Sequence, residues 1–108
     1  MGHDIHGINK SGQEVAYARF SMWNHNSTIL YNVLDASQYH AGVSGCGERT
    51  TFSRREIERA MSAFINLDKN DIPSRSDFLN WDQQQVSDFL ENCLKSARKE
   101  GSVDVYFG

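Results

Sequence analysis

The last eight residues, GSVDVYFG at positions 101–108, decide how the two ends of this chain come together. In this stretch Val103, Val105 and Phe107 alternate with Asp and Tyr, which is the pattern of a half-buried β-strand. A glycine in front of the strand, Gly101, is typical of the residue that ends a helix. A single strand needs a partner for its backbone, so this segment predicts a sheet that begins elsewhere in the chain.

The partner strands are predicted at the start of the chain. Residues 4–9 and 14–20 are rich in Ile, Val, Tyr and Phe, and the four residues between them, Lys-Ser-Gly-Gln, are turn formers. These segments indicate a β-hairpin. Because a two-stranded hairpin is only marginally stable in water, we expect the C-terminal strand to join it as a third strand.

A first helix is predicted after the hairpin, running to about Ala36. Apolar residues recur at helical spacing within 29–34, and Asn24 or Asn26 can serve as the N-cap. The stretch 37–51 then contains three glycines and has no helical period. It is therefore predicted to be the longest loop of the chain.

Two further helices are predicted from their capping residues. Ser53 and Glu56 have the spacing of a capping box, so a helix should begin at Arg54. A second pair, Asn80 and Gln83, has the same spacing and should start a long final helix. Each of these segments carries an apolar stripe that can face a sheet.

The order strand, strand, helix, helix, helix, strand (ββαααβ) predicts an α+β fold. We expect a small three-stranded, mainly antiparallel sheet, made of the N-terminal hairpin and the C-terminal strand and packed against the three helices. With 108 residues, the chain is long enough for one hydrophobic core but not for two. Residues 1–108 are therefore predicted to form a single domain.

Composition narrows the classes of protein that the chain can belong to. A formal net charge of −3 neither requires nor excludes a polyanionic partner. No apolar run approaches the roughly 20 residues that span a bilayer, and the first ten residues lack the apolar segment of a signal peptide. We therefore expect a soluble cytoplasmic protein with no membrane partner, in which Cys46 and Cys93 stay reduced.

The glycine-rich segment 42–51, GVSGCGERTT, is the best predicted binding site. Glycine lets backbone N–H groups approach a ligand closely, and the helix predicted to follow would favour negative charge at its N-terminus. A phosphate or carboxylate could therefore dock here. The residues assigned to this ligand site are His40, Ser44, Gly45, Cys46, Gly47 and Arg49. The competing interpretation is a connection that needs glycine for its backbone conformation, and the P-loop spacing is absent.

The sequence does not show enough suitable residues to assign a catalytic site or a metal site. Cys46 could act as a nucleophile with His40 as its base, but no third residue that would orient the base is identifiable. His3, Asp4 and His6 are types that bind metals, and the last two share one strand face, yet two ligands do not make a site. No catalytic residue, metal or cofactor is therefore assigned.

A nucleic-acid partner is not expected. Four arginines, at positions 49, 54, 55 and 59, lie near the start of the second helix, but three glutamates, at positions 48, 56 and 58, lie among them. A nucleic-acid footprint is usually a clearer basic stripe. We interpret this region as a mixed, solvated helix face.

Two functional hypotheses remain. In the first, the protein is a non-catalytic interaction module that docks a macromolecular partner, for example as a small inhibitor or accessory protein. Trp23 and Trp81 are its predicted anchors, although both could instead pack a helix start into the core. In the second, the protein is a small anionic-ligand binder or minor enzyme that uses loop 42–51. An edge strand could also pair across a two-fold axis to form a homodimer.

Overall fold

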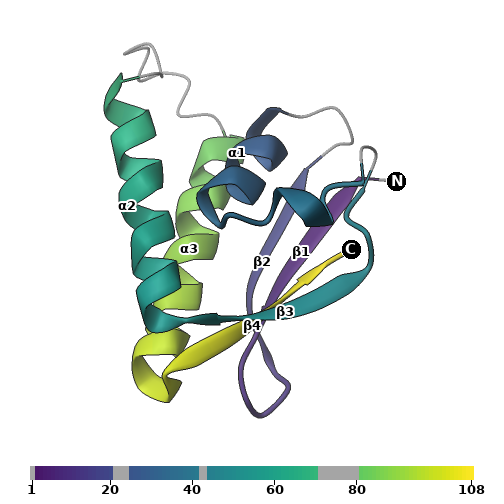
Figure 1. Ribbon diagram of the computed structural model, residues 1–108, viewed down its shortest axis with the longest axis vertical. Coiled ribbons are helices and arrows are strands. Elements are labelled where there is room, and N and C mark those ends of the chain that lie inside the picture. The colour runs from purple at the N-terminus through teal and green to yellow at the C-terminus, as the bar shows by residue number, and fades with distance from the viewer. Residues whose placement is uncertain (1, 21–24, 42–43, 71–80) are drawn as a thin grey trace.

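The computed structural model describes residues 2–20, 25–41, 44–70 and 81–108. In chain order its elements are β1 (His3–Ile8), β2 (Glu14–Phe20), α1 (His25–Val33), the short 3₁₀-helix η1 (Ser37–Tyr39), β3 (Glu48–Ser53), α2 (Arg54–Asn70), α3 (Trp81–Glu100) and β4 (Ser102–Phe107). Figure 1 shows α2 and α3 side by side next to the sheet. The α+β class and the three predicted helices are confirmed.

The sheet has four strands in the order β2-β1-β4-β3, and every neighbouring pair is antiparallel. The hairpin and the return of the C-terminal strand to it are confirmed, because β4 pairs with β1. The predicted three-stranded sheet is wrong: β3, taken as part of a long loop, pairs with the other side of β4. The element order is therefore ββαβααβ rather than ββαααβ.

The strand β3 was missed because it lies at the edge of the sheet. Phe52 is its one buried residue, so the sequence of this strand shows no alternation of apolar and polar residues. The strand ends at Ser53, and α2 begins at the next residue, as the sequence predicts. The Ser53 amide donates to Glu56 Oε1 at 2.9 Å and the Glu56 amide donates to Ser53 Oγ at 3.2 Å, which confirms the capping box.

The ends of the other helices agree with the sequence in part. As predicted, α3 begins at Trp81 and ends before Gly101, whose φ of 89° is the left-handed conformation that glycine adopts easily. The first helix ends at Val33, earlier than predicted, and Asp35 follows it with a φ of 54°. The proposed caps Asn24 and Asn80 lie outside the described residues.

One face of the sheet packs against the helices. Alternate strand residues, among them Ile5, Ala18, Phe20, Phe52, Val103, Val105 and Phe107, form one buried cluster with Leu30, Ile57, Val86, Phe89 and Leu90 of the helices. At roughly 25 cal/mol per Å² of apolar surface, burial of these side chains is the main stabilising contribution.

The opposite face of the sheet carries polar and aromatic side chains, and we call it the open face. It includes Asp4, His6, Ile8, Glu14, Tyr17, Arg19, Arg49, Thr51, Asp104 and Tyr106. Residues that stand directly opposite each other on paired strands share a face. The strand register sets Asp4 opposite Arg19, His6 opposite both tyrosines, Arg49 opposite Tyr106 and Thr51 opposite Asp104.

Candidate functional site

A row of rings crosses the middle of the open face. Tyr17 of β2, His6 of β1 and Tyr106 of β4 are direct neighbours in the strand register. The ring centroids of His6 and Tyr17 are 4.9 Å apart, and those of His6 and Tyr106 are 6.0 Å apart. Tyr17 exposes 45% of its surface, so this row can be reached from solvent.

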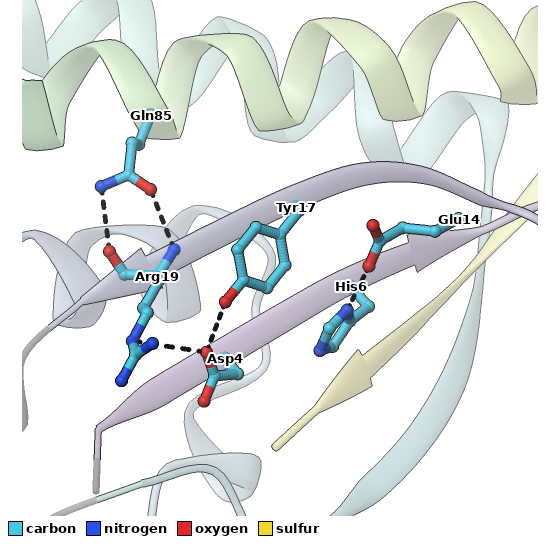
Figure 2. Close-up of polar contacts among 6 residues, drawn as sticks. All are labelled: Asp4, His6, Glu14, Tyr17, Arg19 and Gln85. Atoms are coloured by element: carbon cyan, nitrogen blue, oxygen red, sulfur yellow. Dashed lines mark hydrogen bonds and ion pairs between the residues drawn. The ribbon is translucent and has the colours of Figure 1, made fainter.

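Carboxylates hold the β1–β2 half of this row in position. In Figure 2, Tyr17 donates a 2.6 Å hydrogen bond to Asp4 Oδ1, and Arg19 Nε lies 3.7 Å from the same oxygen. His6 Nδ1 contacts the carboxylate of Glu14. The hydrogen bond to Asp4 raises the pKa of Tyr17, because losing the proton would set two negative charges side by side.

A second carboxylate organises the β3–β4 half. Asp104 accepts hydrogen bonds from Thr51 Oγ1 at 2.7 Å and from Arg49 Nε and Nη2 at 3.0 and 2.6 Å. The hydrogen bonds from Thr51 and then from Arg49 lower the pKa of Asp104, because they stabilise its charged form. The structure therefore places Arg49 on the open face, bound to Asp104.

The outer edge of β2 is covered by a side chain of α3. Gln85 Oε1 accepts a hydrogen bond from the Arg19 amide, and Gln85 Nε2 donates to the Arg19 carbonyl, both at 2.9 Å (Figure 2). The side-chain amide thus makes the two bonds that a neighbouring strand would make. At this position the edge of β2 is already satisfied.

The glycine-rich segment binds to the end of β4. The amides of Gly45 and Gly47 donate to the carbonyls of Gly108 and Phe107 at 2.9 and 2.7 Å, and the Cys46 amide donates to Tyr39 at 2.9 Å. The amides of Gly45, Cys46 and Gly47 therefore already have acceptors within the protein. The segment also leads into β3, six residues long, and not directly into α2.

Two of these glycines have backbone reasons to be glycine. Gly47 has a φ of 79°. A Cβ on Gly45 would lie 2.6 Å from the carbonyl atoms of Phe107 and 2.9 Å from the hydroxyl of Tyr31. Ser44, next to them, donates its hydroxyl to the Gly45 carbonyl at 2.9 Å. These contacts support the interpretation of the segment as a structural connection.

His40 belongs to a cluster of rings under this segment. Its ring centroid lies 4.8 Å from that of His3 and 4.9 Å from that of Tyr31, and His3 Nδ1 forms a 3.2 Å hydrogen bond with the Tyr31 hydroxyl. His3 and Tyr31 are buried. Burial, and then the charge of nearby Cys46, raise the pKa of Tyr31 to about 12. This cluster joins residues 28 positions apart, which no sequence spacing indicates.

A pocket of about 280 Å³ opens beside this cluster. It is lined by Thr28, Tyr31, Asn32, Ser37 and His40. The structure therefore brings His40 together with residues of α1 and η1, while Arg49 lies with Asp104 on the open face. The six residues assigned to one ligand site therefore do not form a single site, because His40 and Arg49 lie in different parts of the structure.

The remaining predicted site residues are also placed by the structure. His3 is buried on the covered face, whereas Asp4 and His6 lie on the open face, so the N-terminal trio is divided between two sides of the sheet. Within the described ranges, no three His, Cys, Asp or Glu side chains lie close enough to hold a metal ion. Trp23 lies outside the described residues, and Trp81 is the first residue of α3.

Among the helices that the structure describes, none has both the length and the apolar character needed to cross a membrane. Arg54 and Glu58, in the region of mixed charge, form an i,i+4 ion pair of 3.8 Å on α2. A scan against protein-family models and searches of curated proteins and of solved structures found no match to this chain.

Proposed function

We propose that this protein is a non-catalytic interaction module that docks a protein partner on the open face of its sheet. The observation that carries the proposal is the row Tyr17–His6–Tyr106, which Arg49 continues on β3 and beside which Arg19 lies on β2. Tyrosine and arginine are among the residue types that contribute most to binding energy at protein interfaces. The described helices pack on the other face, so this row faces outward.

The side chains of the open face are already held in place. Asp4 binds Tyr17 and Arg19, and Asp104 binds Thr51 and Arg49. A surface whose side chains are ordered before binding loses less conformational entropy when a partner docks. This order supports a binding role for a face that stability alone would not require to be so organised.

The charge of the open face favours a protein over a nucleic acid. Three carboxylates, from Asp4, Glu14 and Asp104, stand against two guanidinium groups, from Arg19 and Arg49. This mixture offers no basic stripe to a phosphate backbone. It fits a partner surface that carries both signs of charge around a central hydrophobic or aromatic group.

We also propose that the protein is located in the cytoplasm. Cys46 is an exposed free thiol and Cys93 is a buried one. Exposed free thiols persist where the environment is reducing. The anion-binding alternative at loop 42–51 has less support, because the amides of Gly45, Cys46 and Gly47 already have acceptors.

The test is affinity capture from the source cells with two matched double variants. Tyr17→Ala with Arg19→Ala removes the exposed ring and one charge from the open face. Ile65→Ala with Arg55→Ala is the control, because Ile65 on α2 is as exposed as Tyr17, at 46% against 45%, and Arg55 is likewise exposed. Thermal unfolding of each variant checks that the fold is intact.

We expect a stoichiometric protein to be retained by the wild type and by the α2 control and lost by the open-face variant. Retention by the open-face variant at the wild-type level would overturn the proposal. Failure of the wild type to retain any stoichiometric protein would overturn it as well.

A further inference from the structure

A pocket of about 340 Å³ lies between the hairpin and α3, away from the row of rings on the open face. One wall is a single stripe of α3, since Asn92, Lys95, Ser96 and Lys99 are spaced at i, i+3, i+4 and i+7. Asn9 and Val15 of the hairpin form the opposite side. The volume is near the lower end of the roughly 300 to 1,000 Å³ typical of small-ligand pockets.

The hairpin side of the pocket is fixed by hydrogen bonds. The side chain of Asn9 accepts from the Gln13 amide at 2.9 Å and donates to Gln13 Oε1 at 3.3 Å. Glu100, which also lines the pocket, accepts from the Lys10 amide at 2.9 Å and so ties the hairpin turn to the end of α3. The carboxylate of the pocket is therefore engaged at its rim.

The α3 side carries two positive charges, from Lys95 and Lys99, against the one negative charge of Glu100 at the rim. The ion pairs within the described ranges join other residues, and neither Lys95 nor Lys99 takes part in one. The two lysines are one helical turn apart, so both ammonium groups can reach one anion. Ser96 and Asn92, between and beside them, add a hydroxyl and an amide donor.

We propose that this pocket binds a phosphate monoester of a small molecule. A phosphate monoester carries a charge of about −1.5 to −2 at neutral pH and has three acceptor oxygens, so it engages two ammonium groups more strongly than a carboxylate with a charge of −1 does. Its oxygens are strong acceptors for Lys, Ser and Asn donors. Val15 provides an apolar contact for the carbon skeleton of the ester.

The test is an NMR titration of backbone amides with glycerol 3-phosphate, with uncharged glycerol and inorganic phosphate in parallel and with ionic strength held constant. We expect saturable shift changes at Asn9, Asn92, Lys95, Ser96 and Lys99 with both phosphates and none with glycerol. No saturable change at these residues, or changes centred instead on Gly45–Gly47, would overturn the proposal.

Matched variants separate a built site from general attraction of anions. Lys95→Gln and Lys99→Gln should each weaken binding by roughly two- to fivefold, and the double variant by about tenfold, since exposed charge pairs contribute up to about 1 kcal/mol. Arg98→Gln removes the same charge from an exposed residue of the same helix that does not line the pocket. Equal weakening by Arg98→Gln would overturn the proposal.

A vesicle experiment distinguishes a soluble ester from a lipid headgroup. The protein is sedimented with phosphatidylcholine vesicles that contain phosphatidic acid. We expect it to remain in the supernatant. Sedimentation that the Lys95→Gln, Lys99→Gln double variant abolishes would assign the phosphate to a lipid and overturn the small-molecule proposal.

Discussion

The two faces of the sheet are made by the same four strands, yet they are held together in different ways. On the covered face, the buried Phe107 stacks on the half-buried Tyr39 with centroids 4.9 Å apart and on the buried Tyr31 with centroids 5.3 Å apart. On the open face, Asp4 and Asp104 organise exposed side chains by hydrogen bonds and ion pairs. Burial contributes far more stability than exposed ion pairs do, so the open face can be changed for recognition at little cost.

The largest effect is expected on the covered face, from Phe107→Ala. Phe107 is fully buried and contacts the rings of Tyr31, Tyr39 and Phe52, so its removal leaves a cavity. We expect the free energy of unfolding to fall by about 3 to 5 kcal/mol in urea denaturation. A loss under about 1 kcal/mol would contradict the central place given to this ring.

A smaller effect is expected from Tyr31→Phe, which keeps the ring and removes the hydroxyl. The hydrogen bond to His3 Nδ1 is lost in a buried setting, and we expect a decrease of about 1 to 2 kcal/mol in the free energy of unfolding. Tyr39→Phe, a partly buried tyrosine on the same face, serves as the control. Equal effects of the two changes would show that the contact with His3 adds nothing.

Asp104→Asn tests the organised part of the open face. We expect it to lower the free energy of unfolding by about 0.5 to 1 kcal/mol at neutral pH, because Arg49 loses its charged partner. Thr51 and Arg49 lower the pKa of Asp104, so its contribution is complete above the ordinary value of 3.8 and is lost as the pH falls through the lower value of the folded state. Urea denaturation at neutral pH and in acid should therefore show the gap between variant and wild type closing in acid. A difference in the free energy of unfolding that grows in acid would contradict the lowered pKa of Asp104.

The smallest effect on stability is expected from Tyr17→Phe. The ring stays beside His6 and only the exposed hydrogen bond to Asp4 is lost, so the free energy of unfolding should change by less than about 0.5 kcal/mol. Thermal and urea unfolding measure it. A loss comparable to that of Tyr31→Phe would erase the contrast between the two faces.

The sequence predicted the elements whose signals are local. The capping box at Ser53 and Glu56, the helix end at Gly101 and the hairpin are patterns of adjacent residues, and each was confirmed. The apolar alternation in 102–107 predicted that β4 returns to β1. These features need no knowledge of what lies across the fold.

The parts that sequence missed depend on distant partners. An edge strand such as β3 buries one residue, Phe52, and so lacks a periodic signal. The separation of Arg49 from Cys46 follows from β3, because Arg49 lies opposite Tyr106 on the open face. The contact of His3 with Tyr31 and the pocket along Lys95 and Lys99 depend on how α1 and α3 pack, which composition does not reveal.

The side chain of Gln85 also limits how copies of this protein can assemble. A second molecule that approached along β2 would have to displace it from the peptide groups of Arg19, whereas β3 lies at the opposite margin of the sheet. If both edge strands of the sheet could pair with other copies, molecules could add one after another into an open-ended fibre. Pairing of β3 with β3 of a second copy would instead stop at a dimer. Gln85 therefore makes strand pairing at this position of β2 less favourable than it would be at an unoccupied edge.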